Sequence, residues 1–161
     1  WEGHFEAYCK EVIHDLMRVH PRASQLLPQQ AQLRFINALY LDDGEEILST
    51  VSQKLKTQVS LPDEVLELVP RGMPASGMNL GVSFPMDRPE SRLAVKLNRG
   101  KAHDRDAIVW EVSVVSDAHQ LESFFDDHES WLDNAHDVAE AAFFGFLSDQ
   151  LLEEFGYEPG E

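Results

Sequence analysis

Four side chains in the last third of the chain have the types and the spacing that a divalent metal site needs. They are separated by four, three and four positions: Glu129, Asp133, His136 and Glu140. Residues three or four apart lie on one face of a helix, and carboxylates with an imidazole are ligands for divalent cations. One helix supplies too few converging ligands, however, and no second motif completes the set. We expect a solvated surface column, with a small metal-dependent or ligand-binding enzyme as the alternative.

A run of basic residues forms a second group that could bind a ligand. Six basic residues lie between positions 88 and 105: Arg88, Arg92, Lys96, Arg99, Lys101 and Arg105. Arg92 and Lys96 alternate with apolar residues, so they share the polar face of a strand, and Arg99 and Lys101 follow at its turn. This basic edge could keep a strand from aggregating, contact an anion or nucleic acid, or pair with the acidic helix of another copy. Aromatic residues, which interleave the basic ones in single-strand nucleic-acid platforms, are missing from it.

Three further polar residues occupy positions that are otherwise apolar. Arg34 and Asn37 interrupt the stretch 32–41, so we expect them to join a defined polar network or to bind a ligand together with the basic run. His128 falls within an apolar helical stripe. We expect a core histidine that makes one hydrogen bond, with a ligand or a proton switch as the alternative.

Several common catalytic motifs are missing from the sequence. The glycines match neither the Walker nor the dinucleotide-binding loop, and neither a nucleophile elbow nor a His-Glu-x-x-His motif occurs. The single cysteine, Cys9, excludes an internal disulfide and a cysteine-based zinc site, and it favours a reducing, cytoplasmic setting. We therefore expect no cofactor and favour a protein that is not an enzyme.

The acidic residues are unevenly distributed along the chain, which has a formal net charge of −16. Residues 1–105 hold all 13 basic residues and 14 of the 29 acidic ones, whereas residues 106–161 hold 15 acids and no lysine or arginine. This acidic last third repels nucleic acid and anionic membranes and attracts a cationic partner. No apolar run approaches the roughly 18 residues of a membrane span, and there is no signal-peptide pattern.

The spacing of apolar residues predicts the elements that position these groups. A repeat of three and four predicts a helix over residues 1–17. Residues 32–41 are largely apolar on both alternating faces, which indicates a strand covered on both sides. Asp42 or Asp43 is expected to cap a short helix. The negative charges of Glu45 and Glu46 are favourable near the positive N-terminal end of that helix. A connector with a helical turn at residues 63–68 follows.

The second half of the sequence predicts three strands and a long helix. The strands are expected at residues 79–84, 92–98 and 107–115, with the last of them central. From Ser116 onward the pattern is helical, and its register changes near residues 145–148. One broad apolar stripe of this helix comprises Leu121, Phe124, Phe125, Trp131, Leu132, Ala135, Val138, Ala139, Ala142, Phe143 and Phe146. The acids Asp126, Asp127, Asp133, Asp137 and Glu140 fall outside it.

These elements predict an α+β fold, in which a mostly antiparallel sheet is packed by an N-terminal helix and a long C-terminal amphipathic helix. No segment has the composition of a linker, so we expect one domain over residues 1–161. An amphipathic pattern begins at once with Trp1, and we therefore expect a further segment upstream.

Two short motifs resemble those of an uncharacterised, sporadically distributed bacterial protein family. Residues 33–37, Leu-Arg-Phe-Ile-Asn, are similar to that family's L-R-Y-[IV]-N strand, with Phe35 in place of the tyrosine. Trp1 and Phe5 match its upstream aromatic helix, and Asp133, His136 and Phe143 match its C-terminal D-x-x-H helix. The resemblance implies a β-rich segment upstream and a link to mobile or defence genes, but no activity, cofactor or catalytic residue.

The leading expectation is a cytoplasmic, non-enzymatic interaction domain that associates with itself. The acidic helix and the basic run would then be complementary surfaces of a homo-oligomer, or the acidic helix would bind a cationic protein. The alternatives are the small enzyme described above and an acidic mimic of nucleic acid that occupies a basic groove on another protein.

Overall fold

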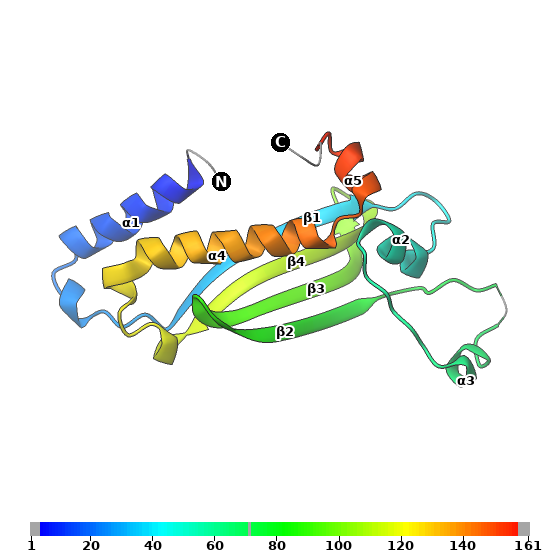
Figure 1. Ribbon diagram of the computed structural model, residues 1–161, viewed down its shortest axis with the longest axis horizontal. Coiled ribbons are helices and arrows are strands. Elements are labelled where there is room, and N and C mark those ends of the chain that lie inside the picture. The colour runs from blue at the N-terminus through cyan, green and yellow to red at the C-terminus, as the bar shows by residue number, and fades with distance from the viewer. Residues whose placement is uncertain (1–3, 71, 158–161) are drawn as a thin grey trace. The chain divides into compact units, whose positions relative to one another are not determined.

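Helices and one four-stranded sheet make up the fold, as shown by a computed structural model that describes residues 4–70 and 72–157 (Figure 1). The sheet is antiparallel, with the strand order β1-β4-β3-β2. The strands are β1 (Gln30–Tyr40), β2 (Asn79–Asp87), β3 (Glu90–Ala102) and β4 (Arg105–Asp117). The helices are α1 (Phe5–Val19), α2 (Ile47–Lys54), α3 (Asp63–Leu66), α4 (Phe124–Phe146) and α5 (Asp149–Glu154), with the 3₁₀ turns η1 (Ala23–Gln25) and η2 (Ala118–Gln120). The predicted α+β class is confirmed.

Short turns bring consecutive strands together. His103 and Asp104 alone join β3 to β4, and both have positive φ angles of 49° and 63°, as the two-residue hairpin turn that matches strand twist requires. Arg88 and Pro89 alone join β2 to β3. Two hairpins in sequence leave β1 to pair with β4, so β4 is an interior strand, as predicted for residues 107–115.

The chain divides into two compact units, each of which contains a part of every strand and of α4. Unit 1 comprises Trp1–Phe35, Ser83–Ala94 and Ser113–Glu140. Unit 2 comprises Ile36–Val82, Val95–Val112 and Ala141–Glu161. Helix α1 therefore belongs to unit 1, and helices α2, α3 and α5 belong to unit 2.

In unit 1, α4 packs on β4 through a tryptophan. The Trp131 Nε1–H donates to the Ser116 hydroxyl at 2.9 Å, and that hydroxyl donates to the Glu90 carbonyl at 2.7 Å. Trp131, Leu132, Ala135 and Ala139 are buried, whereas the predicted solvent-facing acids are exposed. The apolar stripe predicted for this part of the helix is therefore confirmed as its packed side.

In unit 2, the end of α4 packs on β4 through an aromatic stack. Trp110 is 2% exposed, and its ring lies 5.9 Å from that of Phe143 at an interplanar angle of 12°. Helix α4 ends at Phe146, and α5 begins at Asp149 with the Ser148 hydroxyl accepting from the Leu151 N–H. The change of register predicted near residues 145–148 is thus a break between two helices.

Strand β1 differs from the prediction because it is an edge strand with one covered face. Leu33 and Leu39 are buried at 5% and 8% exposure, whereas Ile36, which points the other way, is 54% exposed. Phe35, which points to the same side of the strand as Leu33, meets His136 of α4 with the ring centroids 6.1 Å apart. Residues 32–41 are apolar on both faces, and periodicity alone could not distinguish this strand from one that is buried on both sides.

Two helix starts also differ from the prediction. Glu46, not Asp42 or Asp43, caps α2, because its carboxylate accepts from the Leu48 and Ser49 N–H groups at 3.1 and 2.7 Å. Helix α4 starts at Phe124 and not near Ser116, since β4 continues to Asp117 and η2 follows. The predicted start of the first helix at Trp1 lies outside the described residues.

The carboxylate of Glu45 organises the turn before α2, and the loss of stability on its removal should depend on pH. It accepts from the Asp42 N–H at 3.0 Å and from the Thr50 hydroxyl at 2.9 Å. The hydrogen bond from Asp42 lowers the pKa of Glu45 most, and the hydrogen bond from Thr50 and the positive charge of Lys54 lower it further. Burial acts in the opposite direction but does not outweigh them.

We expect Glu45→Gln to reduce the free energy of unfolding at pH 7 by about 1 kcal/mol. A lowered folded-state pKa stabilises the fold above the ordinary glutamate pKa of about 4.3, and this contribution is lost as the pH falls through the folded value. The difference between the two proteins in urea unfolding should therefore vanish in acid. A constant difference from pH 7 to pH 2 would show that the charge is not involved.

Candidate functional site

Helix α1 has two apolar sides, and only one of them is packed. Cys9, Ile13 and Met17 are half-buried, and no residue of α1 is fully buried. The other side is the α1 stripe, which consists of Tyr8, Val12, Leu16 and Val19 and is 64%, 47%, 41% and 68% exposed. At about 100° per residue these four positions fall within an arc of roughly 80°. A continuous row of apolar side chains in solvent marks an interaction surface.

The local sequence explains where α1 ends and why it is not continuous with β1. The helix ends at Val19 because His20 precedes a proline and takes an extended conformation, with φ −74° and ψ 123°, which the residue before proline prefers. The chain then passes through η1 before it enters β1. Helix α1 is therefore held in unit 1 by the contacts of its own side chains.

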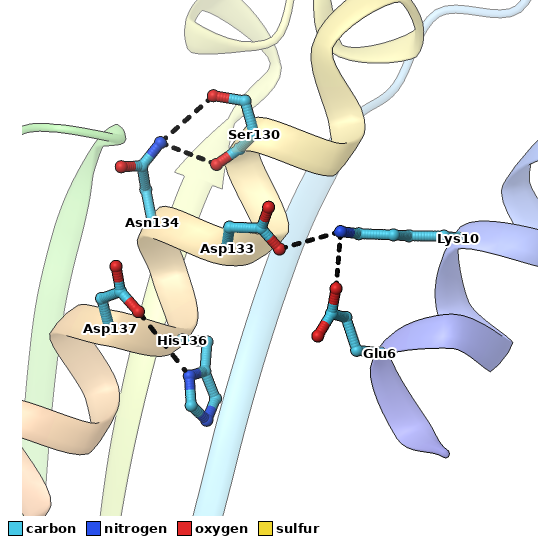
Figure 2. Close-up of polar contacts among 7 residues, drawn as sticks. All are labelled: Glu6, Lys10, Ser130, Asp133, Asn134, His136 and Asp137. Atoms are coloured by element: carbon cyan, nitrogen blue, oxygen red, sulfur yellow. Dashed lines mark hydrogen bonds and ion pairs between the residues drawn. The ribbon is translucent and has the colours of Figure 1, made fainter. Parts of the chain in front are cut away.

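A lysine ties the polar side of α1 to α4. Figure 2 shows Lys10 extended from α1, with its Nζ 2.6 Å from Glu6 of the same helix and 3.0 Å from Asp133 of α4. These two hydrogen bonds, first that of Glu6 and then that of Asp133, raise the pKa of Lys10. Lys10 points about 160° away from the centre of the α1 stripe, so this ion pair leaves the stripe facing outward.

The predicted acid and histidine column is only partly formed. Glu129 and Glu140 are exposed, and Asp133 is 53% exposed beside Lys10. His136 is turned inward. Its side chain is 14% exposed, its ring meets the edge of Phe35 at 6.1 Å, and its Nδ1 lies 3.9 Å from the Asp137 carboxylate (Figure 2). The histidine is therefore not part of a solvated column.

The same four residues do not assemble a metal site. Within residues 4–70 and 72–157, no group of three or more His, Cys, Asp and Glu side chains is placed to hold a metal ion. The metal-site alternative for Glu129, Asp133, His136 and Glu140 is therefore not supported. Glu129, Asp133 and Glu140 are exposed on α4 whereas His136 is turned inward, so the four side chains do not converge on one point.

Three of the six residues of the basic run pair with acids of their own sheet. In unit 2, Lys96 lies 3.5 Å from Glu111, and Arg99 holds Asp106 through Nε at 3.0 Å. This pairing raises the pKa of Arg99 and lowers that of Asp106. In unit 1, Arg92 lies 3.9 Å from Asp117. These acids on β4 leave less free positive charge for a ligand or for the acidic helix of another copy than predicted.

The positions along β3 correct the predicted basic edge further. Arg99 and Lys101 lie within the strand, which continues to Ala102, and not in a turn after it. Because side chains alternate along a strand, these two point to the opposite face from Lys96. They therefore do not form one basic surface with it.

Two of the other predicted polar residues are now placed. Asn37 is half-buried, and its Nδ2, like the Nε1 of Trp110, is buried without a hydrogen-bond partner in the described part of the chain. The polar network predicted for Asn37 is therefore incomplete. Arg34 is exposed on β1.

His128 makes one hydrogen bond, between its Nδ1 and the Phe125 carbonyl at 3.2 Å. Its Nε2 is buried without a partner among the described residues. The single hydrogen bond predicted for His128 is found, but the residue is half-buried and not part of the core.

A cleft of about 450 Å³ in unit 1 was not predicted. It lies between the turn that joins β2 to β3 and the start of α4, where Phe124 and Trp131 contribute aromatic surface. Asp87, Glu90 and Asp127 outnumber Arg88 around it. Its residues come from separate segments of the chain, so no local spacing could reveal it.

The α1 stripe did leave a signal in the sequence. The apolar residues of α1, from Tyr8 round to Met17, span an arc of roughly 180° at about 100° per residue. A surface helix that buries one face needs an apolar stripe of only about 100°. The excess width indicates a second apolar contact.

Comparison with protein-family models, with curated proteins and with solved structures found no match for the chain. The motifs that resemble the bacterial family lie in β1, at Leu33–Asn37, and in α4, at Asp133, His136 and Phe143. Trp1, which is also part of that resemblance, lies outside the described residues. None of the described helices is long and apolar enough to cross a membrane.

Removal of the Lys10 ion pairs should loosen α1. We expect Lys10→Met, which keeps the aliphatic stem, to lower the free energy of unfolding by about 0.5–1 kcal/mol and to speed amide exchange in α1. The control is Lys56→Met, which removes a more exposed pair with Asp149 at 3.3 Å and should have a smaller effect.

The raised pKa of Lys10 gives this prediction a pH dependence. Its stabilising contribution is complete below the ordinary lysine pKa of about 10.4 and disappears as the pH rises through the folded value. Unchanged amide exchange in α1 of the Lys10 variant at pH 7 would show that Lys10 does not hold the helix.

Proposed function

We propose that this protein is a cytoplasmic, non-enzymatic interaction domain that associates with a second copy of itself through the α1 stripe. The exposure of Tyr8, Val12, Leu16 and Val19 on one side of a helix is the observation that supports it. We retain the link to the bacterial family described above as part of this proposal, because its motifs fall on regular elements.

The charge distribution favours a contact through α1 over one through the acidic helix. Helix α1 lies in the nearly neutral part of the chain, whereas residues 106–161 contain 15 acids and no lysine or arginine. Two copies repel each other wherever these acidic segments approach. An apolar contact on α1 uses a helix whose own acids and bases nearly balance. It also replaces the charge-paired contact expected from the sequence, since acids on β4 already occupy Arg92, Lys96 and Arg99.

Substitution of the stripe by a charge tests the proposed function. We expect the wild-type chain to dimerise reversibly in sedimentation velocity, and Val12→Glu or Leu16→Glu to weaken dimerisation by about a hundredfold, because each buries an unpaired carboxylate. His14→Glu is the matched control, since it places the same charge on the far side of α1, where His14 is 74% exposed. A chain that stays monomeric at high concentration, or equal dimers in all variants, would contradict the proposal.

A cationic protein partner is the second candidate function, and the regular spacing of acids on α4 favours it. Glu129, Asp133, Asp137 and Glu140 recur every three or four residues and are exposed. They therefore form a continuous acidic row on one side of the helix. Such a row presents negative charge at intervals of about 5–6 Å, given a rise of about 1.5 Å per residue.

The acidic row can be tested with a defined polycation. We expect the triple variant Glu129→Gln, Asp137→Asn and Glu140→Gln to bind poly-lysine several-fold more weakly than wild type at 0.1 M salt, because the row concentrates charge along one line. The control has the same net charge and neutralises Asp149, Glu153 and Glu154 in α5. Equal weakening by both variants would mean that only total charge matters.

A further inference from the structure

The α1 stripe is bordered on one flank by a row of charged residues, and on the other flank by the packed side of the helix. Glu11, Asp15 and Arg18 lie within an arc of about 60° beside the stripe at roughly 100° per residue. Asp15 and Arg18 are 49% and 66% exposed, and Glu11 is also exposed. On the opposite flank, Cys9 and Ile13 are half-buried. A partner on the stripe would meet the charged row along one side only.

We propose that two copies associate by pairing their α1 helices antiparallel about a two-fold axis, with the charged row of one helix against the charged row of the other. This inference rests on the proposed function and adds the orientation of the partner. The row has direction, since its acids Glu11 and Asp15 lie toward the N-terminus and its base Arg18 toward the C-terminus.

The direction of the row decides between the two ways in which identical helices can pair. In an antiparallel pair related by a two-fold axis, the charged row of one helix lies beside the charged row of the other. The two rows then run in opposite directions. The acids of each row then lie beside Arg18 of the partner. In a parallel pair, each row would face the flank that carries Cys9 and Ile13, which offers no countercharge.

Arg18 can take part in such a contact without losing its own partner. Its Nη2 donates to the Asp15 carboxylate at 2.8 Å, and a guanidinium has five N–H donors. A carboxylate of the second copy can therefore bind Arg18 beside Asp15. The proposed pair would join two acids and one base from each helix in one surface network.

The dimensions of α1 set the strength of this contact. From Tyr8 to Val19 the stripe is about 16 Å long at a rise of about 1.5 Å per residue. A single pair of short helices buries less than the roughly 1,200 Å² typical of stable complexes. The contact is therefore of the weak, reversible class, and charge variants at its edge should shift the equilibrium measurably.

Complementary charge variants test the orientation. Arg18→Glu gives a row that is entirely acidic, and Glu11→Lys with Asp15→Lys gives one that is entirely basic. We expect each variant alone to dimerise roughly tenfold more weakly than wild type, because like charges then face each other. An equimolar mixture should form a heterodimer at least as tight as the wild-type dimer. Sedimentation velocity measures the affinities, and native mass spectrometry distinguishes the heterodimer by its mass.

The outcomes separate the two proposals. A wild-type chain that is monomeric throughout overturns both the self-association and its orientation. A second outcome overturns only the antiparallel pairing. In it, Val12→Glu disrupts the dimer, both row variants dimerise like wild type, and their equimolar mixture forms heterodimers only in the statistical proportion. The neutral variants Arg18→Gln and Glu11→Gln provide a second series, which should weaken the dimer less and show no preference for mixing. Circular dichroism of every variant verifies that α1 remains helical.

Discussion

In each of the two units, a tryptophan side chain packs helix α4 against strand β4, and the remaining structure depends on these two contacts. In unit 1, Trp131 of α4 is buried against β4 and donates its N–H to Ser116. In unit 2, Trp110 of β4 stacks on Phe143 of α4. Aromatic side chains remove about 150–250 Å² each from water, which corresponds to several kcal/mol. An antiparallel sheet needs one apolar face covered, and α4 supplies that cover with a continuous stripe.

Helix α1 is packed less tightly, and this difference leaves its exposed apolar side available to a partner. It contributes no fully buried residue, and its polar side is tied to α4 through Lys10, a pair in which Asp133 is half exposed. Exposed ion pairs contribute at most about 1 kcal/mol, so the packed flank of Cys9, Ile13 and Met17 supplies most of what orders the helix. A second apolar side would be costly to maintain in water unless another surface covers it.

Some of the charges of the chain act within the fold. The acids of β4 pair with the bases of β3, Glu45 and Glu46 organise the start of α2, and Asp133 binds Lys10. The other acids of the row on α4, Glu129, Asp137 and Glu140, add to a strongly negative net charge that keeps copies apart at long range. An apolar helix face in the nearly neutral part of the chain is therefore a consistent place for two copies to meet.

The sequence by itself determined the α+β class, the three strands in the second half of the chain, the interior position of β4 and the solvent side of α4, because local periodicity and turn residues specify these features. Only the tertiary structure decided which apolar faces are covered. Residues 32–41 and α1 are both apolar on two sides, and whether a second side meets another element depends on contacts between distant segments. The same reason explains the pairing of half of the basic run and the inward turn of His136. In each case a partner on another element, such as Glu111 for Lys96 or Phe35 for His136, decides what the side chain can do.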